Sequence, residues 1–278
     1  QDQGSVFFRI QDPGRRRPDG AGTGPQANKR ISVGPQAWQD VPMPKPEVSV
    51  LISCRNEEAN VERCIREVAR VLPQAEILII DGGADRTFAI AESLRGEFPL
   101  VRPIRNVDDR GKGHAIKTGV AAAAADAMVQ FDCDLQFFAD DLPAVLAPVL
   151  RQECELALGS RFLKDSDRSA YQPVFFRDAG NRLLSAVISL LSGRRVTDAT
   201  AGIKAWTRDA MERIDFRDDR YSYEAEMIVR AACLGLRIRD VPVRYASRTA
   251  GASMHANSWK VIQAGFVIMA KALAARWR

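Results

Sequence analysis

The stretch VSVLIS, residues 48–53, decides the fold of this 278-residue chain. It is a short apolar run rich in β-branched residues, a pattern typical of a strand buried on both faces of a parallel sheet. Apolar residues then recur at helical spacing from Val61 to Leu72 and predict a helix with one buried face. A strand followed by a helix is the repeating unit of α/β folds.

The same alternation of strand and helix continues along the chain. Further strands are predicted at 76–81, 100–105, 127–131 and 155–159, and helices at 88–94, 114–125 and 140–150. The pattern then loosens, with a helix around 183–191, a turn-rich segment at 196–202, a helix at 224–234 and a strand at 237–245. We predict an α/β domain with a mainly parallel central sheet flanked by helices, whose ligands gather at the carboxyl ends of the strands.

Composition divides the chain into a tail and a domain. Residues 1–46 contain seven of the 14 prolines and six of the 19 glycines, which predicts a flexible Pro/Gly/Arg-rich tail. The domain is expected over 47–260, with halves at 47–160 and 161–260. Residues 261–278 predict an amphipathic helix, which either lies in a lipid interface or packs on the domain.

Charge and cysteine content narrow the class of protein. The formal net charge is +5, and +3 of it lies in the tail, so the nearly balanced body argues against a nucleic-acid partner. Five scattered cysteines without a C-x-x-C pair indicate a reducing compartment. No apolar run reaches about 18 residues, and no signal-peptide pattern is present. We expect a cytoplasmic protein, soluble or peripheral on the membrane face.

The segment FDCDLQ, residues 131–136, carries the strongest chemical signal. Asp132 and Asp134 lie one residue apart directly after a predicted strand, where two carboxylates are unfavourable without a cation between them. Mg²⁺ or Mn²⁺ prefers oxygen ligands, which Asp134 and the Gln136 amide offer. The alternative is a pair of solvated loop acids.

Two other segments point to an anionic ligand. RGKGHAIKTG, residues 110–119, places two glycines around Lys112 just before a helix, which suits an anion at a helix N-terminus or, alternatively, a plain turn. Glu57 and Glu58 follow the first strand. They are either ligand-binding acids or helix-start acids that interact with the helix dipole.

Taken together, the segments resemble the family 2 glycosyltransferases, and most nearly the dolichol-phosphate mannose synthase and polyprenyl-phosphate glycosyltransferase group. The resemblance covers 47–260 and implies a GT-A fold. Eight segments carry it in order: VSVLISCRNEEANV, EILIIDGGADRT, RGKGHAIKTG, FDCDLQ, ALGSRF, VTDATAGIKAW, YSYEAEMIVRAACLG and RIRDVPVRYASRTAGAS.

The resemblance implies a nucleoside diphosphate sugar donor held mainly by the first half. The residues it assigns are Arg55, Asn56, Glu57, Asp81, Gly111, Lys112, Gly113, Asp132, Arg248 and Ser253. Carboxylates accept paired hydrogen bonds from ribose hydroxyls or a base edge, which fits this role. The acidic turn DGGAD is one residue shorter than the family's D-D-G-S-x-D and lacks its second acid and serine. The base is therefore left open, with UDP and GDP sugars as the leading candidates.

The resemblance also assigns the metal and the reaction. Asp134 and Gln136 would hold Mg²⁺ or Mn²⁺, which offsets charge on the departing diphosphate. The expected reaction is a direct displacement with inversion. The family's H-P-P-E after the glutamine is replaced here by Phe137-Phe138-Ala139-Asp140, a more apolar surface.

Acceptor handling rests on a second group of residues. A phosphate acceptor is already anionic and needs orientation rather than a base, for which the resemblance supplies Arg161, Arg177 and Asn181. A neutral hydroxyl acceptor would need a base, and Asp198 or Glu224 are the candidates. Arg248, Gly251 and Ser253 match a loop that closes over the diphosphate in the family.

We predict a metal-dependent, inverting glycosyltransferase with polyprenyl phosphate as the first-choice acceptor. One alternative is the same chemistry on a soluble metabolite, saccharide or natural product. Another is a catalytically silent nucleotide-sugar binding protein. A sugar-1-phosphate nucleotidylyltransferase would carry G-x-G-x-R after the first strand, where this chain has SCRNE at 53–57. The oligomeric state is left open.

Overall fold

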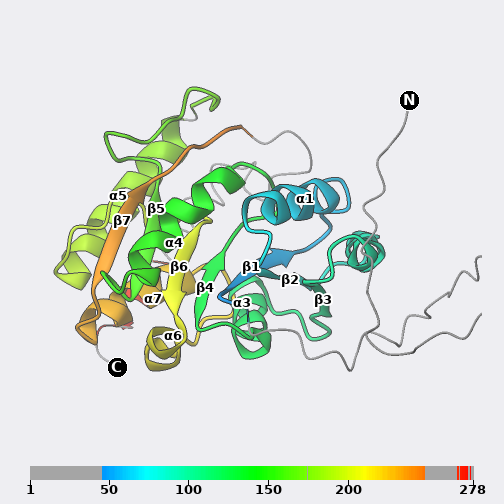
Figure 1. Ribbon diagram of the computed structural model, residues 1–278. Coiled ribbons are helices and arrows are strands. Elements are labelled where there is room, and N and C mark those ends of the chain that lie inside the picture. The colour runs from blue at the N-terminus through cyan, green and yellow to red at the C-terminus, as the bar shows by residue number, and fades with distance from the viewer. Residues whose placement is uncertain (1–45, 174, 248–267, 269, 275, 277–278) are drawn as a thin grey trace, which may run out of the picture. The chain divides into compact units, whose positions relative to one another are not determined.

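The computed structural model describes residues 46–173, 175–247, 268, 270–274 and 276. The predicted tail, apart from residue 46, and most of the predicted C-terminal helix lie outside this range. Within it, seven strands form one sheet in the order β3-β2-β1-β4-β6-β5-β7 (Figure 1). The strands are β1 (Val48–Cys54), β2 (Glu76–Asp81), β3 (Val101–Arg105), β4 (Ala127–Gln130), β5 (Leu156–Ser160), β6 (Lys204–Thr207) and β7 (Ile238–Pro242).

Helices cover both faces of the sheet. They are α1 (Val61–Val71), α2 (Thr87–Ser93), α3 (Lys112–Ala122), α4 (Leu142–Leu150), α5 (Phe175–Ser192), α6 (Arg208–Ile214) and α7 (Tyr223–Cys233), with 3₁₀ turns η1 (Leu94–Gly96) and η2 (Ala139–Asp141). Among the helices of the described part, none combines the length and apolar character that a membrane span requires. All five cysteines are described, and none forms a disulfide.

The pairing pattern brings one end of the sheet together as a single edge. β1 pairs in parallel with β2 and β4, and β2 pairs in parallel with β3. β6 runs antiparallel to both β4 and β5. The carboxyl ends of β1, β2, β4 and β5 therefore meet at the same edge as the amino end of β6, and loops from both halves of the domain converge there.

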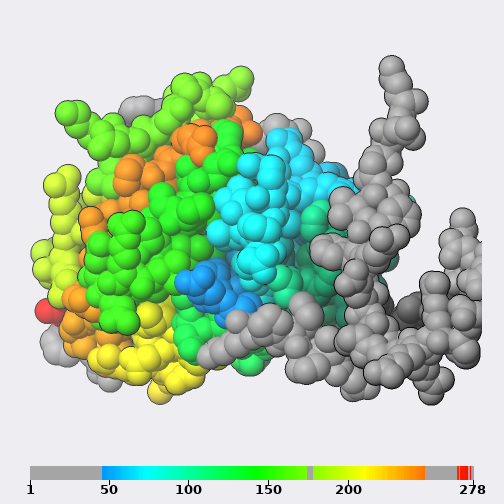
Figure 2. All heavy atoms as spheres, viewed as in Figure 1, coloured from blue at the N-terminus to red at the C-terminus, as the bar shows by residue number. Residues whose placement is uncertain are grey.

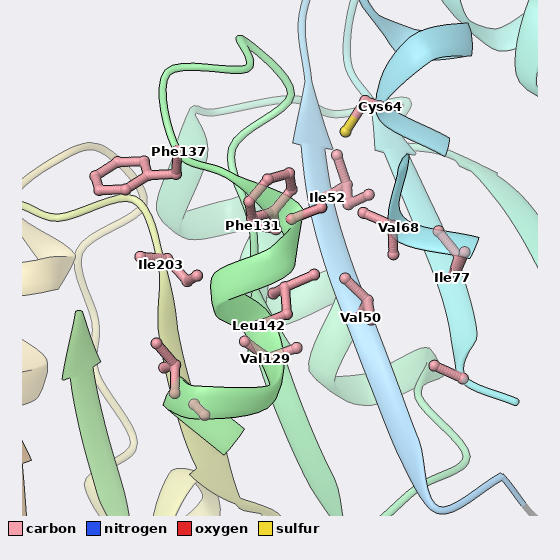
Figure 3. Close-up of a cluster of buried hydrophobic side chains, with 14 of the residues drawn as sticks. Val50, Ile52, Cys64, Val68, Ile77, Val129, Phe131, Phe137, Leu142 and Ile203 are labelled. Atoms are coloured by element: carbon pink, nitrogen blue, oxygen red, sulfur yellow. The ribbon is translucent and has the colours of Figure 1, made fainter. Parts of the chain in front are cut away.

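Alternate residues of each strand enter two separate cores. On one face, Val50 and Ile52 of β1 pack with Val68 of α1 and Leu142 of α4 (Figure 3). Figure 2 shows side chains of the α1 and α4 regions, cyan and green, over this face. On the other face, Leu51 packs with residues of α3 and α7. Because both faces of β1 are buried, its sequence is a nearly continuous run of apolar residues.

The structure confirms the predicted α/β class and the mainly parallel sheet. Predicted strand and helix positions from 48 to 160 agree with the observed elements to within a few residues. The sequence-based prediction assigned no element to β6 or α6. The strand β6 has only four residues and begins with Lys204, a charged residue that alternation rules place at a surface, although its exposed fraction is 0%.

Gly119 of α3 allows this helix to lie close to β1 and β2. A Cβ atom at Gly119 would be 2.8 Å from Leu51 Cδ2 and 3.0 Å from Ile80 Cδ1. A Cβ atom at Gly180 of α5 would meet nothing within 4 Å. The two glycines lie in helices but differ in the space around them.

We therefore expect Gly119→Ala to lower the free energy of unfolding by about 1–3 kcal/mol, because overpacking outweighs the better helix propensity of alanine. The matched variant Gly180→Ala should leave stability unchanged or raise it by up to about 1 kcal/mol. Urea denaturation followed by circular dichroism measures both. Equal effects of the two substitutions would contradict the close packing of α3.

Candidate active site

The turn after β2 is tied to the ends of β1 and β3. Asp81 lies opposite Cys54 in the parallel register, and its side chain is buried. Its carboxylate accepts the Gly83 N–H at 2.8 Å and Arg105 Nη1 at 2.9 Å. Burial raises the pKa of Asp81 above its ordinary value, although these two donors oppose the rise. Much of the hydrogen-bonding capacity of this acid is therefore used within the fold.

Asn56 and Glu57, which follow β1, also bond to neighbouring segments. Asn56 has φ 59°, in the left-handed region, and its Oδ1 accepts the Ala84 N–H at 3.0 Å. Glu57 Oε2 accepts from Asn60 Nδ2 at 2.7 Å, just before α1. The Asn56 contact holds the short acidic turn in place. The Glu57 contact lies at the start of α1, as expected if Glu57 is an acid at a helix start and not a ligand-binding acid.

Asp109 links Arg55 to the glycine turn, and it was missing from the predicted site. Its Oδ1 accepts from Asn106 Nδ2 and from the Gly111 N–H, each at 3.0 Å. Its Oδ2 lies 3.6 Å from Arg55 Nη1. Two adjacent acids in VDDRGKG were the available signal, but their spacing alone does not reveal that one of them faces the end of β1.

The two glycines around Lys112 approach the chain's own backbone. Gly111 has φ 132°, and a Cβ atom there would lie 2.8 Å from the Asp219 carbonyl oxygen. A Cβ atom at Gly113 would lie 2.3 Å from the Asp218 carbonyl oxygen. The start of α3 is thereby fastened against the loop before α7, which brings the second half of the domain up to the first.

Lys112 lies between two carboxylates from different halves of the domain. Its Nζ is 2.9 Å from Asp132 Oδ1 and 3.0 Å from Glu224 Oε1. Burial disfavours the ammonium charge, but the attraction of Asp132 and Glu224 outweighs it and raises the pKa of Lys112 above its ordinary value. Lys112 therefore remains charged and balances the first acid of FDCDLQ.

Asp134 and Gln136 form the part of this segment that fits a divalent cation. Asp134 Oδ1 accepts the Gln136 N–H at 3.2 Å across Leu135, which has φ 57°. The Gln136 amide donates through Nε2 to the Ala246 carbonyl at 3.3 Å, which holds this side chain in place.

The described residues contain no group of three or more His, Cys, Asp or Glu side chains arranged for a metal ion. Mg²⁺ in nucleotide-dependent enzymes commonly uses one or two carboxylates with substrate phosphates and water. The carboxylate of Asp134 and the amide oxygen of Gln136 supply such a partial set. The residues present thus fit a cation that binds together with a diphosphate.

Arg161 and Asp198 form a buried pair at the ends of β5 and the loop before β6. Arg161 Nε donates to Asp198 Oδ2 at 2.6 Å and Nη2 to Oδ1 at 2.8 Å, while Nη2 also reaches Thr200 Oγ1 at 2.9 Å. Burial would raise the pKa of Asp198, but Arg161 outweighs it and lowers the pKa. A depressed pKa disfavours Asp198 as a general base near neutral pH.

Glu224 of α7 is held in the same way. Lys112 and Lys204 lie on either side of its carboxylate, with Lys204 Nζ 3.5 Å from Oε2. Burial opposes the charge, yet the two lysines lower the pKa of Glu224. Both candidate bases are therefore in ion pairs, and neither has the raised pKa that would suit a base.

The remaining predicted acceptor and loop residues are only partly described. Asn181 lies on α5, where its carbonyl accepts from Ser185 Oγ at 2.8 Å. The side chain of Arg177 and all of Arg248, Gly251 and Ser253 lie outside the described residues.

Similarity to known proteins identifies the family of this chain. The glycosyl transferase family 2 model matches residues 49–214, and this chain belongs to that family. An uncharacterized protein of Methanocaldococcus jannaschii is 30% identical over 205 residues, 72% of this chain and 82% of the relative. A dolichyl-phosphate hexose transferase of Haloferax volcanii is 27% identical over 203 residues, 73% of this chain and 84% of the relative.

A similar solved structure is glucosyl-3-phosphoglycerate synthase from Mycobacterium tuberculosis, in complex with Mn²⁺, UDP and glucosyl-3-phosphoglycerate. Its TM-score is 0.65 and its sequence identity is 20%. The matched region comprises 83% of this chain and 80% of the synthase chain. This likeness confirms the GT-A fold. Two further relatives are longer, and this chain spans 52% and 32% of their length.

The Arg161–Asp198 pair predicts a specific pH dependence of stability. Because the folded pKa of Asp198 is depressed, its contribution is complete above the unfolded value of about 4 and is lost as the pH falls through the folded value. Asp198→Asn leaves the buried Arg161 without its counter-charge, so we expect a loss of about 3–5 kcal/mol at pH 7.

The stability difference between wild type and Asp198→Asn should shrink as the pH is lowered below about 4. Asp209→Asn is the control, because the Asp209 side chain is 75% exposed in its pair with Arg213 and should change stability by less than about 0.5 kcal/mol. Denaturation curves at a series of pH values measure both. A deficit that stays constant with pH would mean that the Asp198 charge does not stabilise the fold.

Proposed function

We propose that this glycosyltransferase moves a hexose from a nucleoside diphosphate sugar to polyprenyl phosphate with inversion, using Mg²⁺ or Mn²⁺. Relatives named dolichyl-phosphate hexose transferase and undecaprenyl-phosphate mannosyltransferase support this acceptor. The fold neighbour in complex with Mn²⁺ and UDP supports a metal and a uridine nucleotide. GDP remains the other candidate nucleotide.

One observation carries the proposal. The two acids of FDCDLQ have different partners, since Lys112 balances Asp132 while Asp134 hydrogen-bonds the backbone of Gln136. A charge-balanced carboxylate is suited to accept hydrogen bonds from sugar hydroxyls. An acid beside an amide oxygen is suited to a hard cation. One short segment thus offers a sugar contact and a metal contact side by side.

The residues at the sheet edge then have distinct tasks. In this scheme Arg55, Asn56 and Asp81 would contact the base and ribose of the donor, and Asp132 would orient the hexose. A cation held by Asp134 and Gln136 would supply Lewis-acid stabilisation of the negative charge on the leaving diphosphate. Precise orientation of donor and acceptor supplies the remaining acceleration.

The acceptor phosphate in this proposal attacks without a protein base. A phosphate monoester is anionic near pH 7, so its oxygen needs orientation and not deprotonation. The ion-paired states of Asp198 and Glu224 support this scheme. The guanidinium group of Arg161 is bound to Asp198, so we propose that Arg161 shapes the acceptor region without contacting the phosphate. Arg177 and Asn181 would contact the phosphate instead.

A soluble phosphorylated acceptor is the second candidate. The fold neighbour named glucosyl-3-phosphoglycerate synthase favours it, since its named product carries a phosphate on a small molecule. The two candidates share the donor half and differ in the acceptor. We keep the predictions of a cytoplasmic location and of peripheral membrane contact, and both depend on polyprenyl phosphate being the acceptor.

A transfer assay tests the proposal. The purified protein is given UDP- or GDP-hexoses with Mn²⁺ or Mg²⁺ and either polyprenyl phosphate in detergent or 3-phosphoglycerate. We expect hexose transfer to the polyprenyl phosphate, abolished by EDTA. Asp134→Asn should reduce the rate by about 100-fold or more, since a metal ligand stabilises the transition state by several kcal/mol.

Asp140→Asn is the matched control, because Asp140 is exposed and pairs with Arg70 at the surface. It should keep the wild-type rate within about two-fold. Transfer only to 3-phosphoglycerate would favour the soluble acceptor. Donor binding with no transfer to any acceptor, or transfer unaffected by EDTA and Asp134→Asn, would contradict the proposal.

A further inference from the structure

Lys204 is a basic residue that is fully buried within the sheet. It is the first residue of β6, its exposed fraction is 0%, and it lies opposite Gln130 of β4 in the antiparallel register. Its Nζ donates to the Ala201 carbonyl and lies 3.5 Å from Glu224 Oε2. The alternation along β6 turns Lys204 and Trp206 to the face covered by α7.

The face of the sheet that Lys204 shares with α7 is largely apolar. Neighbours on the same face, such as Trp206 and Met128, are fully buried and apolar. Removing an ammonium group from water costs several kcal/mol, and burial lowers the pKa of Lys204 below its ordinary value. A well-packed apolar residue often stabilises a fold as well as a buried ion pair does. The charge therefore suggests a task beyond stability.

Lys204 is linked to Asp132, the proposed sugar contact, through three ion pairs. Glu224 pairs with Lys204 through Oε2 and with Lys112 through Oε1. Lys112 in turn pairs with Asp132. The links come from three separate elements, β6, α7 and α3, and end at the loop after β4. We call this series the lysine relay: Lys204, Glu224, Lys112 and Asp132.

Further groups fix the surroundings of the relay. Tyr223 of α7 donates to Gln130 Oε1 at 2.5 Å, and its hydroxyl is 3.4 Å from Glu224 Oε1. Gly202 lies against Asp132, where a Cβ atom would be 1.9 Å from Oδ2. Tyr221 and Asp198 also interact electrostatically with members of the relay. The position of Asp132 is thus determined from two sides.

We propose that Lys204 is a positioning residue for the donor sugar: by holding Glu224 it fixes Lys112, which in turn holds Asp132 in place for the hexose. This inference rests on the proposed function. The proposal predicts that loss of Lys204 affects sugar transfer and not nucleotide binding. The residues proposed to bind the nucleotide, Asp81, Asn56 and Arg55, contact other groups, namely Arg105, the Ala84 N–H and Asp109.

Lys204→Met tests the proposal, with Lys204→Arg as the charge-conserving variant. We expect Lys204→Met to lower kcat by about 10-fold or more with little change in the donor KM, as loss of a group that orients a reactive residue does. Affinity for UDP or GDP alone, measured by calorimetry, should stay within about two-fold. Lys204→Arg should retain more activity than Lys204→Met.

A second readout does not depend on activity. The Lys112 side chain is 14% exposed and held by two carboxylates. Acetylation by acetic anhydride, followed by mass spectrometry, should be faster at Lys112 in Glu224→Gln, which removes one of its two carboxylates, and should differ from wild type in Lys204→Met, where Glu224 loses its second cation. Lys117→Met is the matched control on α3, because Lys117 pairs with Asp219 instead. It should change neither the acetylation of Lys112 nor kcat.

The possible outcomes distinguish a failure of the proposed function from a failure of the positioning role of Lys204. If the wild type transfers no hexose, the proposed function fails, and the labelling of Lys112 still tests the relay. Unchanged labelling together with an unchanged kcat in Lys204→Met would overturn the positioning role. A loss of kcat that is matched by equal losses of nucleotide affinity and thermal stability would overturn it as well, because that pattern indicates a structural role. If Lys204→Met does not fold, Lys204→Arg and Glu224→Gln are measured with the same two readouts, because each changes the pair between Lys204 and Glu224.

Discussion

The ion pairs of Lys112 with Asp132 and Glu224 are the interaction on which the active-site geometry depends. They join the loop after β4 to α7 and so connect the two halves of the domain at the carboxyl edge of the sheet. The antiparallel insertion of β6 makes this contact possible, because it brings the amino end of β6 and the helix α7 to the edge where β1, β2 and β4 end. Without Lys112, two carboxylates from opposite halves would face each other in a poorly hydrated site, which electrostatics strongly disfavours.

Charge balance is a shared feature of three acids of this site. Asp198 pairs with Arg161, Glu224 with two lysines and Asp132 with one, so each of these three carboxylates has a cation within 4 Å. Such a site cannot readily remove a proton from a hydroxyl, but it can present fixed dipoles and charges to an anionic substrate. Pre-organisation of this kind agrees with a displacement in which both the nucleophile and the leaving group carry phosphate charge.

Much of the fold could be predicted from the sequence because its elements obey simple periodicities. The apolar runs of β1 and β2 and the stripe of α1 are repeated local signals. The strand β6 has no such signal, since Lys204 interrupts its apolar alternation and only the contact with Glu224 explains its burial. Among the site residues, Asp132 and Asp134 follow a strand and could be found locally. Lys204 and Asp109 could not be found in this way, because Lys204 acts through Glu224 and Asp109 through Arg55, and spacing does not encode these tertiary contacts.

The central claim is that neighbouring acids have different tasks, with Asp132 balanced by Lys112 and Asp134 reserved for a divalent cation. Crystals grown with Mn²⁺ and a nucleoside diphosphate, measured at the manganese absorption edge, test this directly. The account predicts one anomalous peak within bonding distance of Asp134 and Gln136 and of the diphosphate, with Lys112 still paired to Asp132. Manganese bound to Asp132 with Lys112 displaced, or a bound nucleotide without manganese at Asp134, would contradict it.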